Sequence, residues 1–139
     1  MMNIKRRIVA LLLFTLIIFL SGCGGETEQK ISGFATATLE KQTIKNGEIT
    51  HLTIKGFNNG NVPVKVHFEF SSDKPEMVKL SFPSNIELTL QPGEDTGNKI
   101  LTVQGFTETI KTDYLITTRL VDDTKKVIYE TSTILSVAR

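Results

Sequence analysis

Few side chains in this 139-residue chain could act as nucleophiles, general bases or metal ligands. There is one cysteine, Cys23, and there are two histidines, His51 and His67. A single thiol excludes an internal disulfide framework and a cysteine-based metal cage. The sequence also contains no Gly-x-Ser-x-Gly elbow and no glycine-rich phosphate loop. These residues therefore predict a protein that is not an enzyme and that holds no cofactor and no metal.

The two histidines fall on the polar positions of alternating segments. If these segments formed neighbouring strands, His51 and His67 could share a metal ion. A structural zinc site would need two further ligands, and cysteine cannot supply them here. The alternative, which the composition favours, is two histidines that face the solvent.

Acidic residues offer a second possible metal site. Asp113, Asp122 and Asp123 lie around one segment, and Glu94-Asp95 lies on a predicted turn. Calcium takes six or more oxygen ligands, and the chain contains no Asp-x-Asp-x-Asp-Gly loop. Turn formation and solubility are therefore the preferred interpretation, with calcium binding as the alternative.

Residues 1–22 are predicted to be a signal peptide. Lys5, Arg6 and Arg7 precede an apolar stretch of 13 residues, 8–20, which only Thr15 interrupts. A helix needs about 20 apolar residues to span a bilayer. A shorter apolar stretch behind a positive segment is typical of a secretory signal, so the residues that follow are predicted to be exported.

The end of this stretch, Leu20-Ser21-Gly22-Cys23, resembles the prokaryotic lipobox. The resemblance implies that a signal peptidase recognises Leu20, Ser21 and Gly22 and cuts before Cys23. It also implies that a lipid is attached to the Cys23 sulfur through a thioether. Two or three acyl chains hold a protein firmly at a membrane, whereas one does not. The alternatives are an uncleaved signal anchor and an unmodified thiol.

Cleavage would leave 117 residues with 13 basic and 15 acidic side chains, a net charge of −2. This balance argues against nucleic acid as a partner, because phosphate binding needs a clustered excess of Lys and Arg. Residues 24–30 contain no apolar side chain and begin with two glycines. Residues 23–32 are therefore predicted to form the lipidated cysteine and a flexible tether, and residues 33–139 a single domain.

This domain is predicted to be all-β. In Val62–Phe70 apolar residues alternate with polar ones, so one face packs in a core and the other meets water. Pro63 is tolerated near the start of such a strand. Alternation or a β-branched and aromatic composition predicts further strands at 34–39, 51–55, 78–82, 86–90, 99–103, 114–121 and 127–137. The last two are apolar on both faces, which leaves their orientation open.

Turn-forming residues separate the predicted strands, at 58–61, 72–75, 83–85, 91–94 and 122–125. Seven or eight short strands at this spacing predict an antiparallel β-sandwich. Phe57 and Phe106 each follow a glycine near a predicted strand end. We expect both rings to close the ends of the core, and the alternative is that they lie on a binding loop.

Several turn motifs occur in an order that is similar to one protein family. They are Asn46–Ile54, Asn58–Asn61, Leu90–Glu94 and Tyr114–Asp122. Together they resemble the immunoglobulin-like CARDB modules of prokaryotic surface proteins, over residues 44–137. The resemblance implies a sandwich of seven to eight strands and a role in adhesion, scaffolding or presentation. It implies no catalytic residues, and the disulfide and buried tryptophan of antibody domains are absent.

The sequence thus predicts a lipoprotein at the extracytoplasmic face of a cell membrane. We expect a non-catalytic binding, adhesion or envelope-scaffold module, anchored through Cys23, whose partner is an unidentified protein or polysaccharide. An alternative is an accessory subunit of a membrane complex such as a transporter or secretion assembly. A small hydrolase is a third and less favoured class.

Overall fold

The computed structural model describes residues 25–82 and 87–139. The predicted signal peptide, Cys23 and the predicted turn at 83–85 lie outside the described residues. Among the residues that are described, no helix is long and apolar enough to cross a membrane.

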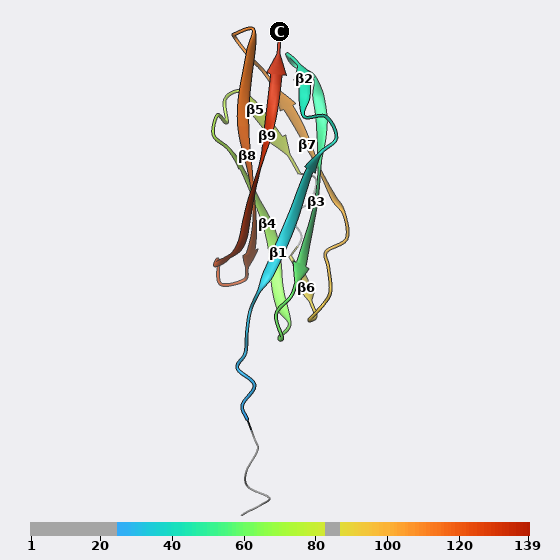
Figure 1. Ribbon diagram of the computed structural model, residues 1–139, viewed down its shortest axis with the longest axis vertical. Coiled ribbons are helices and arrows are strands. Elements are labelled where there is room, and N and C mark those ends of the chain that lie inside the picture. The colour runs from blue at the N-terminus through green and yellow to red at the C-terminus, as the bar shows by residue number, and fades with distance from the viewer. Residues whose placement is uncertain (1–24, 83–86) are drawn as a thin grey trace, which may run out of the picture.

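Two β-sheets pack face to face (Figure 1). The four-stranded sheet has the order β1-β3-β7-β5, and the five-stranded sheet has the order β2-β9-β8-β4-β6. The first consists of β1 (Gly33–Leu39), β3 (Ile49–Asn58), β7 (Lys99–Gly105) and β5 (Val78–Ser81). The second consists of β2 (Thr43–Lys45), β9 (Val127–Ala138), β8 (Lys111–Asp122), β4 (Val64–Ser72) and β6 (Leu88–Leu90). The predicted all-β sandwich is confirmed, and every strand pair is antiparallel except β2 with β9.

The alternation predicted for β4 is present. Val64, Val66 and Phe68 are buried between the sheets, whereas Lys65 and Glu69 are exposed. The strand begins at Val64, directly after Pro63, because proline has no N–H to donate to a ladder.

The structure settles the orientation of the two strands that the sequence left open. Tyr114, Ile116 and Leu120 of β8 are buried, and Leu115 between them is 41% exposed. In β9 Leu135 is buried and Ile134 is 58% exposed. The pairing of β8 with β9 shifts at Leu120/Val121, which is why no single period runs through both segments.

A contiguous apolar core fills the space between the sheets. Its largest fully buried apolar side chains are Ile44, Leu52, Ile54, Leu101, Ile116, Leu120, Leu135, Val66, Val103 and Val137. Both sheets contribute to this set. Burial of apolar surface is therefore the main stabilising term, at roughly 25 cal/mol per Å² removed from water.

The connections make the sandwich immunoglobulin-like. The chain leaves the four-stranded sheet after Leu39 and joins the five-stranded sheet as β2, parallel to β9. At the β7–β8 corner, the Tyr114 hydroxyl donates a hydrogen bond of 2.7 Å to the Phe106 carbonyl. Immunoglobulin-like sandwiches use a tyrosine in the same way to fix this corner.

Candidate functional site

The two histidines lie on opposite sheets. His51 is on β3 of the four-stranded sheet, and His67 is on β4 of the five-stranded sheet. His51 Nδ1 lies 2.9 Å from Glu40 Oε2, and His67 Nε2 lies 3.4 Å from Glu69 Oε1. Because the two strands are not neighbours, the hypothesis that these imidazoles share a metal is wrong.

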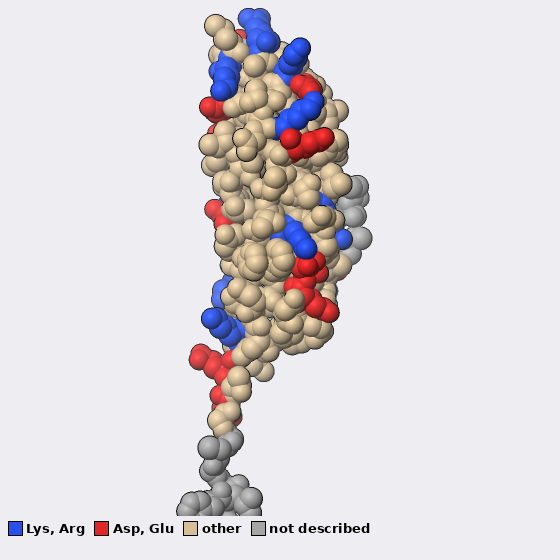
Figure 2. Space-filling view, turned by 45° about the vertical axis from the view of Figure 1, so that its right-hand side comes forward, with Lys and Arg blue, Asp and Glu red and all other residues tan. Residues whose placement is uncertain are grey.

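The acidic residues of the calcium hypothesis are also separated. Asp113 and Asp122 lie at opposite ends of β8, and Asp95 forms an ion pair of 2.9 Å with Lys55. On the face drawn in Figure 2, acidic side chains lie next to basic ones. Within residues 25–82 and 87–139, no group of three His, Cys, Asp or Glu side chains is placed to hold a metal ion.

Asp122 has a structural role at the β8–β9 turn. Its carboxylate is 2% exposed and accepts hydrogen bonds from the Thr124 hydroxyl (2.6 Å) and from the amides of Thr124 and Lys126 (both 2.9 Å). Burial alone would raise the pKa of Asp122, but these three hydrogen bonds outweigh it and hold the pKa below its ordinary value. The predicted turn at 122–125 is thus confirmed, with Lys125 at a φ of 66°.

This lowered pKa predicts a pH dependence of stability. A carboxylate with a folded-state pKa below its unfolded value contributes fully above the unfolded value, about 3.9 for aspartate. The contribution is lost as the pH falls through the folded-state pKa. The free energy of unfolding of the wild type, measured with urea, should therefore decline between pH 5 and pH 3. In Asp122→Asn this decline should be smaller. The control is Asp123→Asn, which alters the exposed neighbour and should keep the wild-type decline; an unchanged decline in Asp122→Asn would contradict the assignment.

The expectation for Phe57 and Phe106 is corrected by the structure. Gly56 and Gly105 face the core, and each phenylalanine lies on the outer side and is half-buried. A Cβ on Gly105 would lie 2.5 Å from Val137 Cγ2, so any side chain there would displace Val137. Phe57 stacks on Phe34 of the neighbouring strand, with ring centroids 4.3 Å apart. The glycines thus allow close packing of the sheets, and the rings cover the outer surface.

The N-terminal segment is hydrogen-bonded to the loop at residues 58–61. The Lys30 amide donates to Asn61 Oδ1 (2.7 Å), and Asn61 Nδ2 donates to the Glu28 carbonyl (2.8 Å). The Asn61 amide donates to the Lys30 carbonyl (3.1 Å). The amides of Asn59 and Gly60 both donate to the Ser32 carbonyl, at 3.1 and 3.0 Å. We call these five hydrogen bonds the N-terminal clasp.

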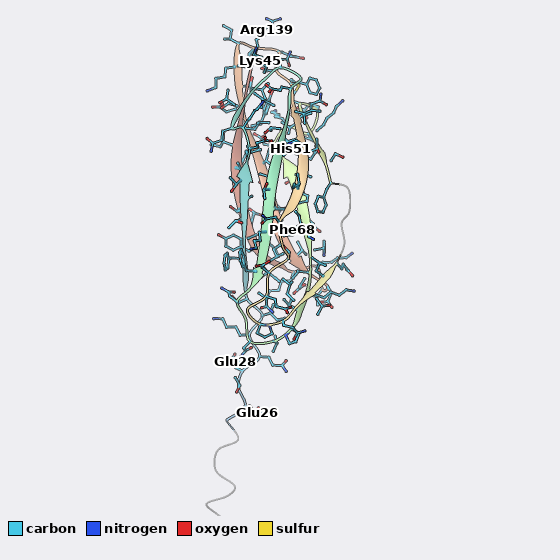
Figure 3. The ribbon with its side chains drawn as sticks, turned by 90° about the vertical axis from the view of Figure 1, so that its right-hand side faces the viewer. Glu26, Glu28, Lys45, His51, Phe68 and Arg139 are labelled. Carbon is cyan, nitrogen blue, oxygen red and sulfur yellow. The ribbon has the colours of Figure 1, made fainter. Side chains whose placement is uncertain are left out.

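Gly60 makes the clasp possible, because a Cβ at this position would collide with the Lys30 carbonyl oxygen and the Ser32 amide nitrogen. The predicted tether is therefore joined to the domain from Glu28 onward. Figure 3 places Glu26 and Glu28 at one end of the sandwich and Lys45 and Arg139 at the other. The clasp fixes the end of the domain from which the N-terminal segment leaves.

We expect the clasp to protect the peptide bond after Lys30 from cleavage by trypsin. Asn61→Ala removes two of the five hydrogen bonds, each worth about 1 kcal/mol, so trypsin should cut after Lys30 roughly thirtyfold faster. The rate is read by mass spectrometry from the appearance of a fragment beginning at Ile31. Asn59→Ala is the matched control, because that side chain is exposed and the clasp uses only its backbone amide. Equal rates in both variants would show that the clasp does not hold the segment.

No family model and no curated protein matches the chain. Solved structures are similar in fold. A FixG-related protein from Vibrio parahaemolyticus is 12% identical with a TM-score of 0.53, over 74% of this chain and 94% of that one. A CARDB domain from Pyrococcus furiosus, in complex with di-metal ions, is 14% identical with a TM-score of 0.50, over 79% and 89%.

A conjugative transposon lipoprotein from Bacteroides eggerthii is 10% identical with a TM-score of 0.53, over 76% of this chain and 98% of that one. In other similar structures the matched region belongs to a much longer chain, of which this protein spans as little as 6%. At these identities the similarity shows the fold alone. The class that the fold defines is the immunoglobulin-like β-sandwich.

The structural roles of Asn58 and Asn61 could not be predicted from the sequence. Asn58 and Asn61 carry only a turn signal, because the pattern of a loop does not reveal what its side chains bind. The Asn58 side chain is buried and holds three backbone groups, and the Asn61 side chain holds the N-terminal segment.

Proposed function

We propose that this protein is a lipid-anchored, extracytoplasmic binding or scaffold module without catalytic activity. The observation that carries the proposal is the combination of a lipobox-like sequence at Leu20–Cys23 with a sandwich whose N-terminal segment leaves from one end. The similarity in fold to a lipoprotein and to a CARDB domain supports it. The membrane is the first partner, through Cys23.

The clasp limits how far the domain can move from such an anchor. Cys23 and Glu28, the first clasped residue, are five residues apart, which fully extended span at most roughly 17 Å. The Asn58–Asn61 end of the sandwich would then lie close to the bilayer. The opposite end of the sandwich, where Figure 1 marks the C-terminus, would point away from the bilayer. Membrane confinement raises local concentration, so individually weak contacts suffice for such a module.

Crosslinking in intact membranes, followed by mass spectrometry, tests this role. A polysaccharide or a copy of the protein as the dominant product would support adhesion or scaffolding. One dominant membrane-protein partner would support the accessory-subunit alternative. A Cys23→Ser protein, present at equal amount, is the control and should lose these products. Unchanged products from that protein would contradict a membrane-anchored role.

A further inference from the structure

One side of the sandwich is bordered by two long strands with open edges. β1 is the last strand of the four-stranded sheet, and β2 covers β9 only at Ser136–Ala138. The edge strands on the other side, β5 and β6, have only four and three residues. Short strands, charges and prolines are the usual protection of sheet edges against further pairing.

The two long edges lie close together, and neither has such protection in its own sequence. β1 has the sequence Gly-Phe-Ala-Thr-Ala-Thr-Leu, without charge or proline. From Thr131 to Leu135, β9 also has neither. In this segment of β9 the threonines and the isoleucine favour pairing with a further strand.

Backbone groups of β9 point toward this open side. The Ser136 amide donates to the Gln42 carbonyl, on the side of β9 away from β8. The amides and carbonyls of alternate residues in a strand point the same way, so those of Ser132 and Ile134 also face that side. β1 lies alongside without forming a ladder with β9 in the described part of the chain, and the Thr133 hydroxyl donates to the Ala37 carbonyl (3.3 Å).

A groove runs along this side. Its volume is about 640 Å³, within the range of ligand-binding clefts. The lining contains no charged residue and consists of Ala37, Thr38, Leu39, Gln42, Thr43, Ser132, Thr133, Ile134 and Ser136. Most of these side chains are small or β-branched, and Ile134 is 58% exposed.

We infer that this groove accepts an extended, uncharged segment of a partner polypeptide, which adds a strand to β9 in line with β2. An uncharged lining favours an uncharged segment, because a buried charge would have no partner. Strand addition obtains affinity from main-chain hydrogen bonds and specificity from alternate side chains. The inference rests on the binding role proposed above, but not on the lipid anchor.

A second copy of this chain fits the groove less well. Antiparallel pairing of two β9 edges with Ser132 opposite Ile134 would place β2 of one copy against residues 128–130 of the other, because β2 lies beside Ser136–Ala138 on the same edge. This leaves a segment of another polypeptide as the occupant that the geometry favours.

The test uses the full chain in detergent and a capped synthetic peptide of three Thr-Val repeats as the probe. Hydrogen exchange should slow at least tenfold at the amides of Ser132 and Ile134 when the peptide is added. The same peptide with N-methylated backbone amides is the probe control and should not slow exchange. Ile134→Lys should weaken peptide binding at least tenfold. Ile49→Lys, which alters a similarly exposed isoleucine on the other sheet, should stay within twofold of the wild type.

Unchanged exchange at both amides, or equal effects of the two peptides, would overturn the inference. Slow exchange without peptide, together with a dimer in sedimentation, would show that a second copy occupies the edge and would overturn the proposed partner. These results do not depend on lipidation. They therefore show whether a strand binds in the groove, independently of whether the protein is anchored to a membrane.

Discussion

Replacing Asn58 with alanine is expected to lower the free energy of unfolding by about 3 kcal/mol, because a buried polar group left unpaired costs about 1–3 kcal/mol. Asn58 is 1% exposed at the end of β3. Its Nδ2 donates to the carbonyls of Val62 (2.9 Å) and Leu90 (3.0 Å), and its Oδ1 accepts from the Gly60 amide (2.9 Å). Alanine would leave all three groups without their partner.

Urea unfolding measures this loss, with two comparison variants. Asn59→Ala alters the exposed neighbour and should remain within about 0.5 kcal/mol of the wild type, as is usual for surface changes. Asn58→Asp keeps the acceptor for Gly60 but sets a carboxylate oxygen against two carbonyls, so it should destabilise the fold as well. One unpaired buried polar group already costs about 1 kcal/mol. If Asn58→Ala lowers the free energy of unfolding by less than this, the role assigned to Asn58 is contradicted.

Replacing Cys23 with serine is expected to remove the protein from the membrane fraction and to leave the precursor uncleaved. The thioether needs a sulfur nucleophile, and Cys23 is the sole cysteine of the chain. Two or three acyl chains give firm anchoring, so their loss should change the fractionation almost completely. Membrane flotation and gel migration measure the two effects.

Ser21→Ala serves as the control for this variant, because it keeps a small residue before the cleavage point and should leave lipidation intact. If Cys23→Ser floats and migrates like the wild type, Cys23 is not the lipidation site. The leader would then act as a signal anchor or the attachment would lie elsewhere.

Alternation predicted much of the fold because the period of two is a local property. The segments containing Val62–Phe70 and Leu52–Ile54 show it clearly, and both form strands with the expected faces buried. β2 was not predicted, since three residues with a single buried isoleucine are too short to show a period. Of the predicted strand at 86–90, residue 86 lies outside the described residues, and β6 begins at Leu88.

Strand pairing is not a local property, and the candidate sites depended on it. Whether His51 and His67 meet is decided by the order β1-β3-β7-β5 and β2-β9-β8-β4-β6, which the alternation does not encode. The same holds for Gly105, whose packing against Val137 brings together residues 32 positions apart. The N-terminal clasp was also missed, since a polar segment without periodicity carries no sign of what it binds.

The proposed role depends most on a lipid at Cys23 that tethers a non-catalytic sandwich to the membrane. Mass spectrometry of the protein extracted from membranes tests the tether most directly. We expect a mature N-terminus at Cys23 and a mass increase on the Cys23 peptide that matches a thioether-linked diacylglycerol. A chain that retains residues 1–22 and carries a free Cys23 thiol would contradict it.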